Sequence, residues 1–148
     1  MIYVEEIMIV VACIDERKGM MFNCRRQSRD RAVCNDILKD CEGHRLYMTA
    51  YSKGLFEKMG NAEIVVSEDM MQQARNDDSC FIEDIDISGH EKLIQEVILY
   101  QWNRHYPADT YFPLDLSEEK WVLEKRDEFQ GSSHEKITKE VYKRRKNR

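Results

Sequence analysis

The sequence predicts a single α/β domain in three layers, with a mainly parallel central sheet and an antiparallel hairpin at its C-terminal end. The chain has 148 residues, which is the usual size of one domain. Strand-like and helix-like segments alternate along most of its length, an order that is typical of α/β proteins. The end of the chain instead holds two extended segments around a short turn, as an antiparallel hairpin does.

The first elements support a buried parallel sheet. Residues 7–14 read IMIVVACI, a continuous apolar run rich in β-branched residues, and this predicts a strand buried on both faces. Residues 15–23 are expected to form a loop. Over residues 28–41 apolar side chains recur at helical spacing, so a helix is predicted there, with Ser28 as its N-cap and Gly43 after its end.

The middle and the end of the chain complete the pattern. Strands are expected at 45–50, 62–66, 79–82 and 97–102, and helical segments at 53–59, 68–75 and 89–96. Two extended segments, 121–129 and 135–144, flank Gly131-Ser132-Ser133 and predict the closing hairpin. Because no linker interrupts this order, one domain is expected over residues 1–148, with a basic tail at about 143–148.

Composition excludes several classes of protein. The content of hydrophobic residues is 42%, which supports a real core, and the formal charge of −5 gives no general argument for nucleic-acid binding. No apolar run approaches the ~20 residues that span a bilayer, and no signal peptide is visible. The five cysteines lack Cys-x-x-Cys spacing, so reduced thiols, a cytoplasmic location and no membrane partner are expected. The four histidines form no metal-binding motif, so no metal is expected.

One sequence motif, together with the order of elements, indicates a protein family. Residues 109–113 read Asp-Thr-Tyr-Phe-Pro and match the Asp-Thr-x-Phe-Pro motif of the dihydrofolate reductase family, placed after a strand and before Trp121. Over nearly the whole chain, the order of elements resembles that family. The resemblance implies a dihydrofolate reductase-like fold, and it places Asp30 near the family's pterin-binding carboxylate.

The family's cofactor-binding segments are replaced in this chain. In the family, a Gly-Arg-x-Thr segment contacts the phosphates of the nicotinamide cofactor. The corresponding residues of this chain, 49–52, read Thr-Ala-Tyr-Ser, so the phosphate-binding arginine is absent. The family also has a Gly-Gly pair that lets the backbone approach the pyrophosphate. The corresponding residues of this chain, 81–86, carry three carboxylates instead, which repel phosphate. We therefore predict that NADPH does not bind in the family's manner, and no other cofactor is expected.

The substrate end keeps one carboxylate. Asp30 is the candidate catalytic residue, and the alternative is an ordinary aspartate that stabilises the start of a helix. The family's Pro-Trp pair is replaced around Asn23, Arg25 and Arg26, and Tyr100 falls near its substrate-contacting threonine. We predict a cleft between these residues that takes a small anionic or heteroaromatic ligand.

Two other functions stay open at this point. The first is an active but divergent dihydrofolate reductase that uses NADPH, which Asp30 and residues 109–113 support. The second is an RNA-interacting or RNA-processing protein, because Arg25, Arg26, Arg29 and Arg31 and the tail are basic. The stretches 25–28 and 133–136 also resemble short bacterial sequences that carry the name ribonuclease Z, although that nuclease's histidine-rich motif is absent.

Ser132, Ser133 and His134 suggest nucleophilic catalysis, but a Gly-Ser-Ser turn explains them. The ligand and the oligomeric state are left undetermined.

Overall fold

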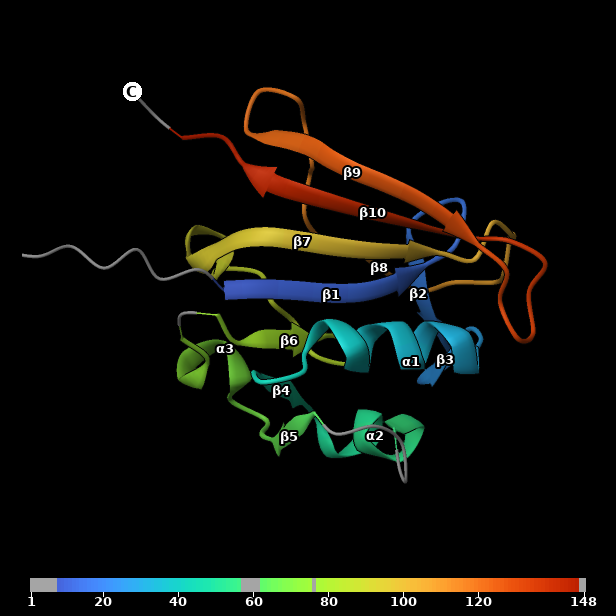
Figure 1. Ribbon diagram of the computed structural model, residues 1–148, viewed down its shortest axis with the longest axis horizontal. Coiled ribbons are helices and arrows are strands. Elements are labelled where there is room, and N and C mark those ends of the chain that lie inside the picture. The colour runs from blue at the N-terminus through green and yellow to red at the C-terminus, as the bar shows by residue number, and fades with distance from the viewer. Residues whose placement is uncertain (1–7, 57–61, 76, 147–148) are drawn as a thin grey trace, which may run out of the picture.

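The computed structural model describes residues 8–56, 62–75 and 77–146. They build a seven-stranded sheet with the order β5-β4-β6-β1-β7-β10-β9 (Figure 1). The strands are β1 (Met8–Ile14), β4 (Arg45–Met48), β5 (Glu63–Val66), β6 (Ser79–Phe81), β7 (Ile94–Gln101), β9 (Trp121–Phe129) and β10 (Ile137–Arg144). The first five of these pair in parallel, and β10 is antiparallel to both β7 and β9. The predicted α/β sheet with a C-terminal antiparallel hairpin is confirmed.

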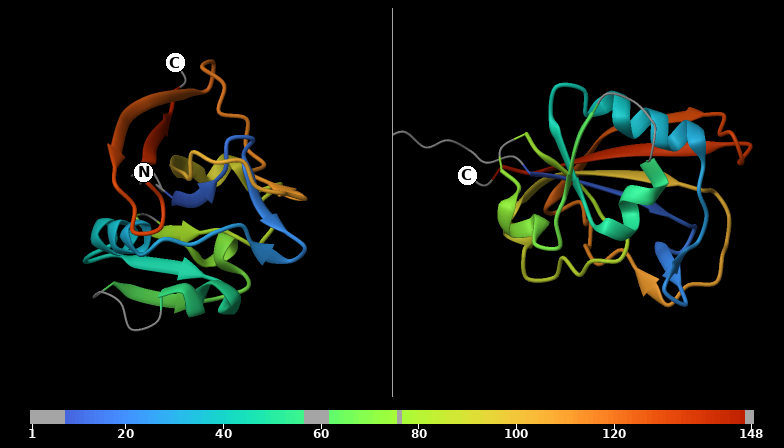
Figure 2. Two further views of the ribbon diagram at one scale, coloured as in Figure 1. Left: turned by 90° about the vertical axis from the view of Figure 1, so that its right-hand side faces the viewer. Right: turned by 90° about the horizontal axis from the view of Figure 1, so that it is seen from below.

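Helices cover the two faces of this sheet. The longest is α1 (Arg31–Asp40), which lies across one face and buries Val33, Cys34, Ile37 and Leu38 at helical spacing (Figure 2). The others are short: α2 (Ala50–Lys53), α3 (Met70–Gln73) and two 3₁₀ turns at Gly54–Phe56 and Glu91–Leu93. The side chains of β1 alternate between two cores, because Val10 and Ala12 pack with α3 whereas Val11 packs with α1. The central strand is therefore buried on both faces, as its apolar run predicts.

Several local predictions need correction. The segment 15–23 is a loop only in its first half, because β2 (Gly19–Phe22) pairs with β3 (Arg25–Arg26) and with β8 (Thr110–Tyr111) in a second, three-stranded sheet. Strands of two residues show no periodicity, and so the sequence does not reveal them. The helix predicted over 89–96 is only one 3₁₀ turn, since Ile94 already pairs with Met8. The predicted residues 7 and 57–59 lie outside the described ranges.

The N-cap of α1 is Asp30 and not Ser28. The Asp30 carboxylate accepts hydrogen bonds from the backbone N–H groups of Ala32 and Val33, which satisfies two of the donors left free at a helix start. Serine and aspartate are both good N-caps, so local sequence does not decide between them. Asp30 is buried, so its carboxylate faces the inside of the domain.

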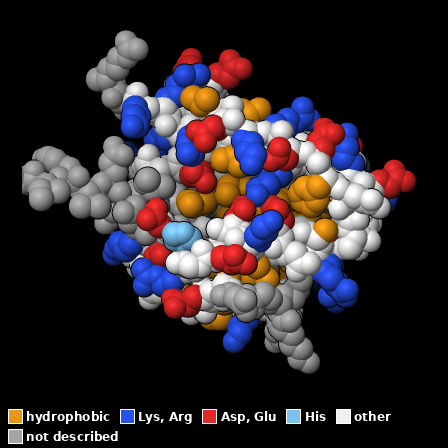
Figure 3. Space-filling model, viewed as in Figure 1, with side chains coloured by type: hydrophobic (Ala, Val, Ile, Leu, Met, Phe, Trp, Pro, Cys, Tyr) orange, Lys and Arg blue, Asp and Glu red, His pale blue; other side chains and the backbone are white. Residues whose placement is uncertain are grey.

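The carboxyl ends of the parallel strands meet at one edge of the sheet. Asp15 follows β1, Thr49 follows β4 and Glu83 lies just after β6, so polar side chains gather where ligands bind in open α/β sheets. Over the face seen in Figure 1, acidic and basic side chains are interspersed (Figure 3). Among the described residues, none of the helices has the length and apolar character that crossing a membrane requires.

Candidate functional site

A nearly buried ion pair lies at the centre of this edge. The Nε and Nη2 atoms of Arg26 donate to the two carboxylate oxygens of Glu83 at 2.8 and 3.0 Å, a bidentate arrangement. The Ser52 hydroxyl donates to Glu83 at 2.8 Å, and the Arg26 guanidinium lies 4.4 Å from the centre of the Tyr51 ring. Burial alone would lower the pKa of Arg26, but the hydrogen bond and charge of Glu83 raise it, so this guanidinium stays charged.

Residues 49–52 and 81–86, which the resemblance aligns with the family's cofactor-binding segments, are hydrogen-bonded to each other. The Ser52 hydroxyl binds Glu83, and the Thr49 hydroxyl donates to Asp84 at 2.7 Å. The side chains of both segments therefore satisfy one another at the carboxyl ends of β4 and β6. No phosphate-binding arginine and no bare glycine backbone is present in either segment.

Asp30 is the hub that joins α1 to the β9–β10 loop. Besides its capping bonds, its carboxylate accepts the N–H groups of Ser132 at 2.9 Å and of Ser133 at 2.8 Å. It also accepts the Ser132 hydroxyl at 3.0 Å, and His134 Nδ1 lies 2.9 Å from Oδ2. Burial would raise the pKa of Asp30, but the bonds from Ser132, His134 and Ser133 hold it well below its usual range. The carboxylate is thus ionised and surrounded by donors.

His134 occupies a buried position between three elements. Its ring stacks on Trp102, with ring centres 4.6 Å apart and planes 21° apart. Its Nε2 atom lies 3.1 Å from the Ser28 hydroxyl oxygen and 3.1 Å from that of Tyr106. Because the ionised Asp30 faces Nδ1, the tautomer of a neutral imidazole that suits this site carries its proton on Nδ1 and leaves Nε2 as an acceptor. No sequence pattern indicates this cluster, because Ser28 and Asp30 lie more than 100 residues from His134 in the chain.

The structure brings together only some of the predicted ligand-binding residues. Arg26 and Asp30 line one closed cavity, whereas Arg25 is exposed on β3. The backbone N–H of Asn23 donates to Asp109 at 3.0 Å, so this residue fixes the β2–β3 turn to the 109–113 motif. Tyr100 is fully buried, and its hydroxyl donates to Asp36 of α1 at 2.6 Å. Burial and the charge of Asp36 raise the pKa of the Tyr100 phenol, which stays protonated.

The closed cavity separates two open ones. It holds about 10 Å³, room for about one water molecule, and Arg26, Glu83, Asp30 and Trp102 are among its walls. On one side lies the acidic cavity of about 620 Å³, whose carboxylates are Glu83, Asp84, Asp86 and Asp109. On the other lies the arginine cavity of about 520 Å³, lined by Arg29, Arg31, Asp30, Leu55, Ser132 and Ser133 among others. Both open cavities have the size of small-molecule sites.

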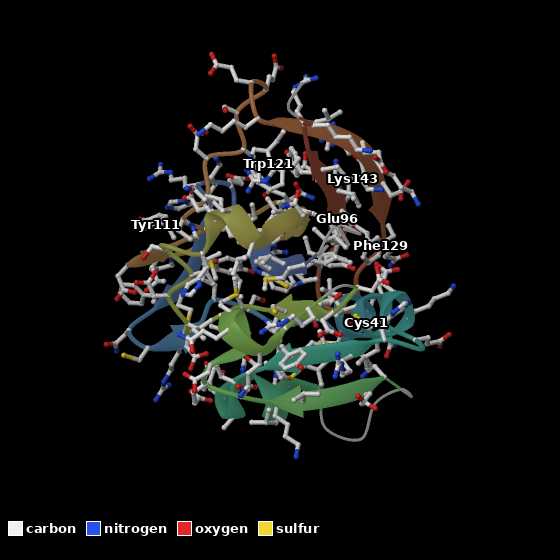
Figure 4. The ribbon with its side chains drawn as sticks, turned by 90° about the vertical axis from the view of Figure 1, so that its left-hand side faces the viewer. Cys41, Glu96, Tyr111, Trp121, Phe129 and Lys143 are labelled. Atoms are coloured by element: carbon white, nitrogen blue, oxygen red, sulfur yellow. The ribbon has the colours of Figure 1, made fainter. Side chains whose placement is uncertain are left out.

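Residues on the two faces of the sheet can be told apart in the structure. Tyr111, which lines the acidic cavity, lies on one side of the sheet, and Cys41 and Phe129 lie on the other (Figure 4). Cys34 lines the closed and the arginine cavities, and burial raises the pKa of its thiol to about 12, so it is not a nucleophile at neutral pH. Across the described ranges, no group of three or more His, Cys, Asp or Glu side chains is placed to hold a metal ion.

The comparisons with known proteins define the class of fold. The structure is similar to dihydrofolate reductase from Enterococcus faecalis complexed with NADP(H) and RAB-propyl, with a TM-score of 0.68 and 8% sequence identity. The similarity covers 95% of this chain and 97% of that one, so the predicted dihydrofolate reductase-like fold is confirmed. No protein-family model and no curated protein sequence matches the chain. At 8% identity the similarity shows the fold alone.

Proposed function

We propose that this dihydrofolate reductase-fold protein binds a small, positively charged heteroaromatic compound in the acidic cavity and does not bind NADPH in the family's manner. The charge of the cavity supports this proposal. Glu83 is neutralised by Arg26, but within the described part of the chain no Lys, Arg or His pairs with Asp84, Asp86 or Asp109. The lining contains no lysine or arginine. Such a cavity attracts a cation and repels the phosphates of a nucleotide.

The walls of the acidic cavity favour a planar ligand. Met20, Met21, Ile85 and Pro113 supply apolar surface, and Tyr51 and Tyr111 supply two aromatic rings. Tyr111 is 51% exposed, so its ring is available for stacking. Aromatic faces bind flat cations through both dispersion and the ring quadrupole. The carboxylates then orient ring N–H groups by charge-assisted hydrogen bonds.

A pair of acridines of matched shape tests the charge preference. Fluorescence titration should show 9-aminoacridine, a cation at neutral pH, binding at least about tenfold more tightly than acridine-9-carboxylate. Asp84→Asn combined with Asp86→Asn should remove the difference, whereas Asp115→Asn, outside the cavity, should leave it unchanged. Equal affinity for the two acridines, or micromolar binding of NADPH by calorimetry, would refute the proposal.

The second candidate is a divergent, NADPH-dependent dihydrofolate reductase. The fold and the 109–113 motif favour it, as does the cofactor carried by the Enterococcus protein. Asp30, at the start of α1, lines the closed cavity, which also supports this candidate. That cavity has room for only about one water molecule, which counts against it. A steady-state assay of NADPH absorbance with dihydrofolate decides: turnover that disappears in Asp30→Asn supports this candidate, and no turnover rejects it.

A further inference from the structure

Three side chains around the closed cavity form a hydrogen-bonded chain of the kind that activates a serine. The Ser28 hydroxyl oxygen lies 3.1 Å from His134 Nε2, and His134 Nδ1 lies 2.9 Å from Asp30 Oδ2. This is the connectivity of nucleophile, base and orienting acid, which recurs on unrelated folds and is recognised by geometry. We propose that Ser28 is a nucleophile that hydrolyses small carboxylic esters bearing a negative charge. The proposal uses a different cavity from the acidic one and does not depend on it.

The acid and the base are held rigidly. The side chain of Asp30 is 0% exposed and that of His134 is 2% exposed. The N–H groups of Ser132 and Ser133 fix the carboxylate, and the stacked Trp102 ring fixes the plane of the imidazole. With its proton on Nδ1, the imidazole presents the Nε2 lone pair to the hydroxyls of Ser28 and Tyr106. Such preorganisation is what a general base requires.

Two backbone donors lie directly after the nucleophile. Within the described residues, the N–H groups of Arg29 and Asp30 donate to no protein acceptor, whereas the next N–H, of Arg31, binds the Ser132 hydroxyl. In acyl transfer, free N–H groups beside the nucleophile stabilise the negative charge that develops on the carbonyl oxygen. Their place in the chain suits that role, since one of them belongs to the residue after the nucleophile.

The arginine cavity defines the class of substrate. Arg29 and Asp30 line both the closed and the arginine cavity, so the two spaces adjoin beside Ser28. No carboxylate of the described residues forms an ion pair with Arg29 or Arg31. Two unneutralised guanidinium groups suit a carboxylate. A half-ester of a short dicarboxylic acid would place its carboxylate on these arginines and its ester carbonyl toward the half-buried Ser28.

The reaction balances with water as the only co-substrate. Ser28 Oγ bonds to the ester carbonyl carbon while its proton passes to His134 Nε2. The bond from that carbon to the leaving oxygen then breaks, and the imidazolium proton converts the leaving alkoxide to an alcohol. Water attacks the acyl-serine with Nε2 again taking a proton. The carbon–Oγ bond breaks, Oγ regains the proton and the carboxylic acid leaves.

Tyr106 offers a matched control. Its hydroxyl oxygen also lies 3.1 Å from Nε2, so in the resting protein it competes with Ser28 for one lone pair. Tyr106→Phe removes that competitor and keeps the ring. A hydrolytic Ser28 should therefore react at least as fast in Tyr106→Phe as in the unaltered protein. If the cluster only stabilises the fold, the hydroxyls of Ser28 and Tyr106 are equivalent hydrogen-bond partners of His134, and neither reacts with an ester.

Covalent labelling tests the nucleophile without knowledge of the natural substrate. The full-length protein is treated with a fluorophosphonate probe and analysed by intact and peptide mass spectrometry. The expected result is one adduct, on Ser28, that is absent in Ser28→Ala, retained in Tyr106→Phe and slowed at least about tenfold in His134→Gln. No adduct on Ser28 in protein that is folded by circular dichroism overturns the proposal. If His134→Gln fails to fold, the comparison of Ser28→Ala with Tyr106→Phe still decides.

Hydrolysis of two esters tests the role of the arginines. The 4-nitrophenyl half-ester of succinic acid should be cleaved about tenfold faster, in kcat/KM, than 4-nitrophenyl acetate. Arg29→Ala with Arg31→Ala should bring the ratio of the two kcat/KM values close to one, while Ser28→Ala abolishes cleavage of both esters. Cleavage that persists in Ser28→Ala contradicts the proposal. Binding of 9-aminoacridine should be unaffected by Ser28→Ala, so that failure here is distinguishable from failure of the proposed function.

Discussion

The acidic and arginine cavities are similar in size but opposite in charge. Their volumes are about 620 and 520 Å³, and between them lies the closed cavity that the Arg26–Glu83 pair helps to fill. Glu83 borders the acidic side, whereas Asp30 borders the arginine side. One edge of the sheet therefore carries two compartments of opposite charge, for which we propose different ligands. The fold supplies the position of this edge, and a few side chains decide what it binds.

The two compartments also differ in how they are held. The arginine cavity depends on Asp30, which connects the start of α1 to Ser132, Ser133 and His134 across more than 100 residues of sequence. The carboxylates of the acidic cavity accept fewer hydrogen bonds than Asp30 does, as when Asp84 accepts one from Thr49. A single substitution should therefore damage the arginine side far more than the acidic side.

The largest effect is expected from Asp30→Ala. This change removes the N-cap and leaves buried donors from Ser132, Ser133 and His134 without an acceptor. The free energy of unfolding should fall by about 3–5 kcal/mol, the range for breaking a buried charged network. Urea unfolding followed by tryptophan fluorescence measures it.

Asp86→Ala is the matched control on the acidic side. Within the described residues its carboxylate is hydrogen-bonded only to the neighbouring Ser88 and is exposed, so the stability should change much less. Equal losses in the two variants would show that the compartments do not differ in this way.

The next effect concerns the wall between the cavities. Arg26→Met should lower the free energy of unfolding by about 2–3 kcal/mol, because it leaves the Glu83 carboxylate nearly buried with only the Ser52 hydroxyl as donor. In Arg26→Met with Glu83→Gln the uncompensated charge is gone, so part of the loss should be recovered. A double-mutant cycle should give a coupling energy of about 1–3 kcal/mol. A coupling near zero would mean that the pair does not stabilise the wall.

Much of the fold could be predicted from the sequence, because it rests on local patterns. The β-branched run before Asp15 and the 3.6-residue spacing in α1 are periodic signals, and residues 109–113 are a motif. The fold match confirms what they indicate. The small sheet of β2, β3 and β8 was not predicted, because its strands are too short to show alternation and β8 pairs with β2 from about 90 residues further along the chain.

The site was harder to predict because its contacts are non-local. The family resemblance predicts Asp30, but its partners in the β9–β10 loop follow only from the folded chain. The local sequence predicts Ser28 as the helix cap and explains His134 by a turn. Their proximity depends on how the hairpin returns to α1, which no spacing in the sequence records.

A smaller effect is expected from Gly131→Ala, which probes the hub from the hairpin. A Cβ atom on Gly131 would collide with the Asp30 carboxylate and would lie 2.8 Å from the His134 carbonyl oxygen. We expect a loss of about 2 kcal/mol in the free energy of unfolding, the typical cost of overpacking. Gly54→Ala is the matched control, because nothing lies within 4 Å of its Cβ and its φ is −59°. It should be neutral or slightly stabilising, and a loss equal to that of Gly131→Ala would contradict the crowding at the hub.

The smallest effect is the acid sensitivity of the hub. The pKa of Asp30 is lower in the folded protein than the value of about 3.9 in an unfolded chain. A depressed carboxyl pKa contributes stability that is complete above the unfolded value and is lost as the pH falls toward the folded one. Between pH 7 and pH 3 the folded protein should lose about 1 kcal/mol through this group. Urea unfolding at both pH values measures the loss, and Asp30→Ala shows what the other carboxylates contribute. The stability difference between the unaltered protein and Asp30→Ala should therefore shrink at pH 3, and a difference that stays constant would mean that Asp30 has an ordinary pKa.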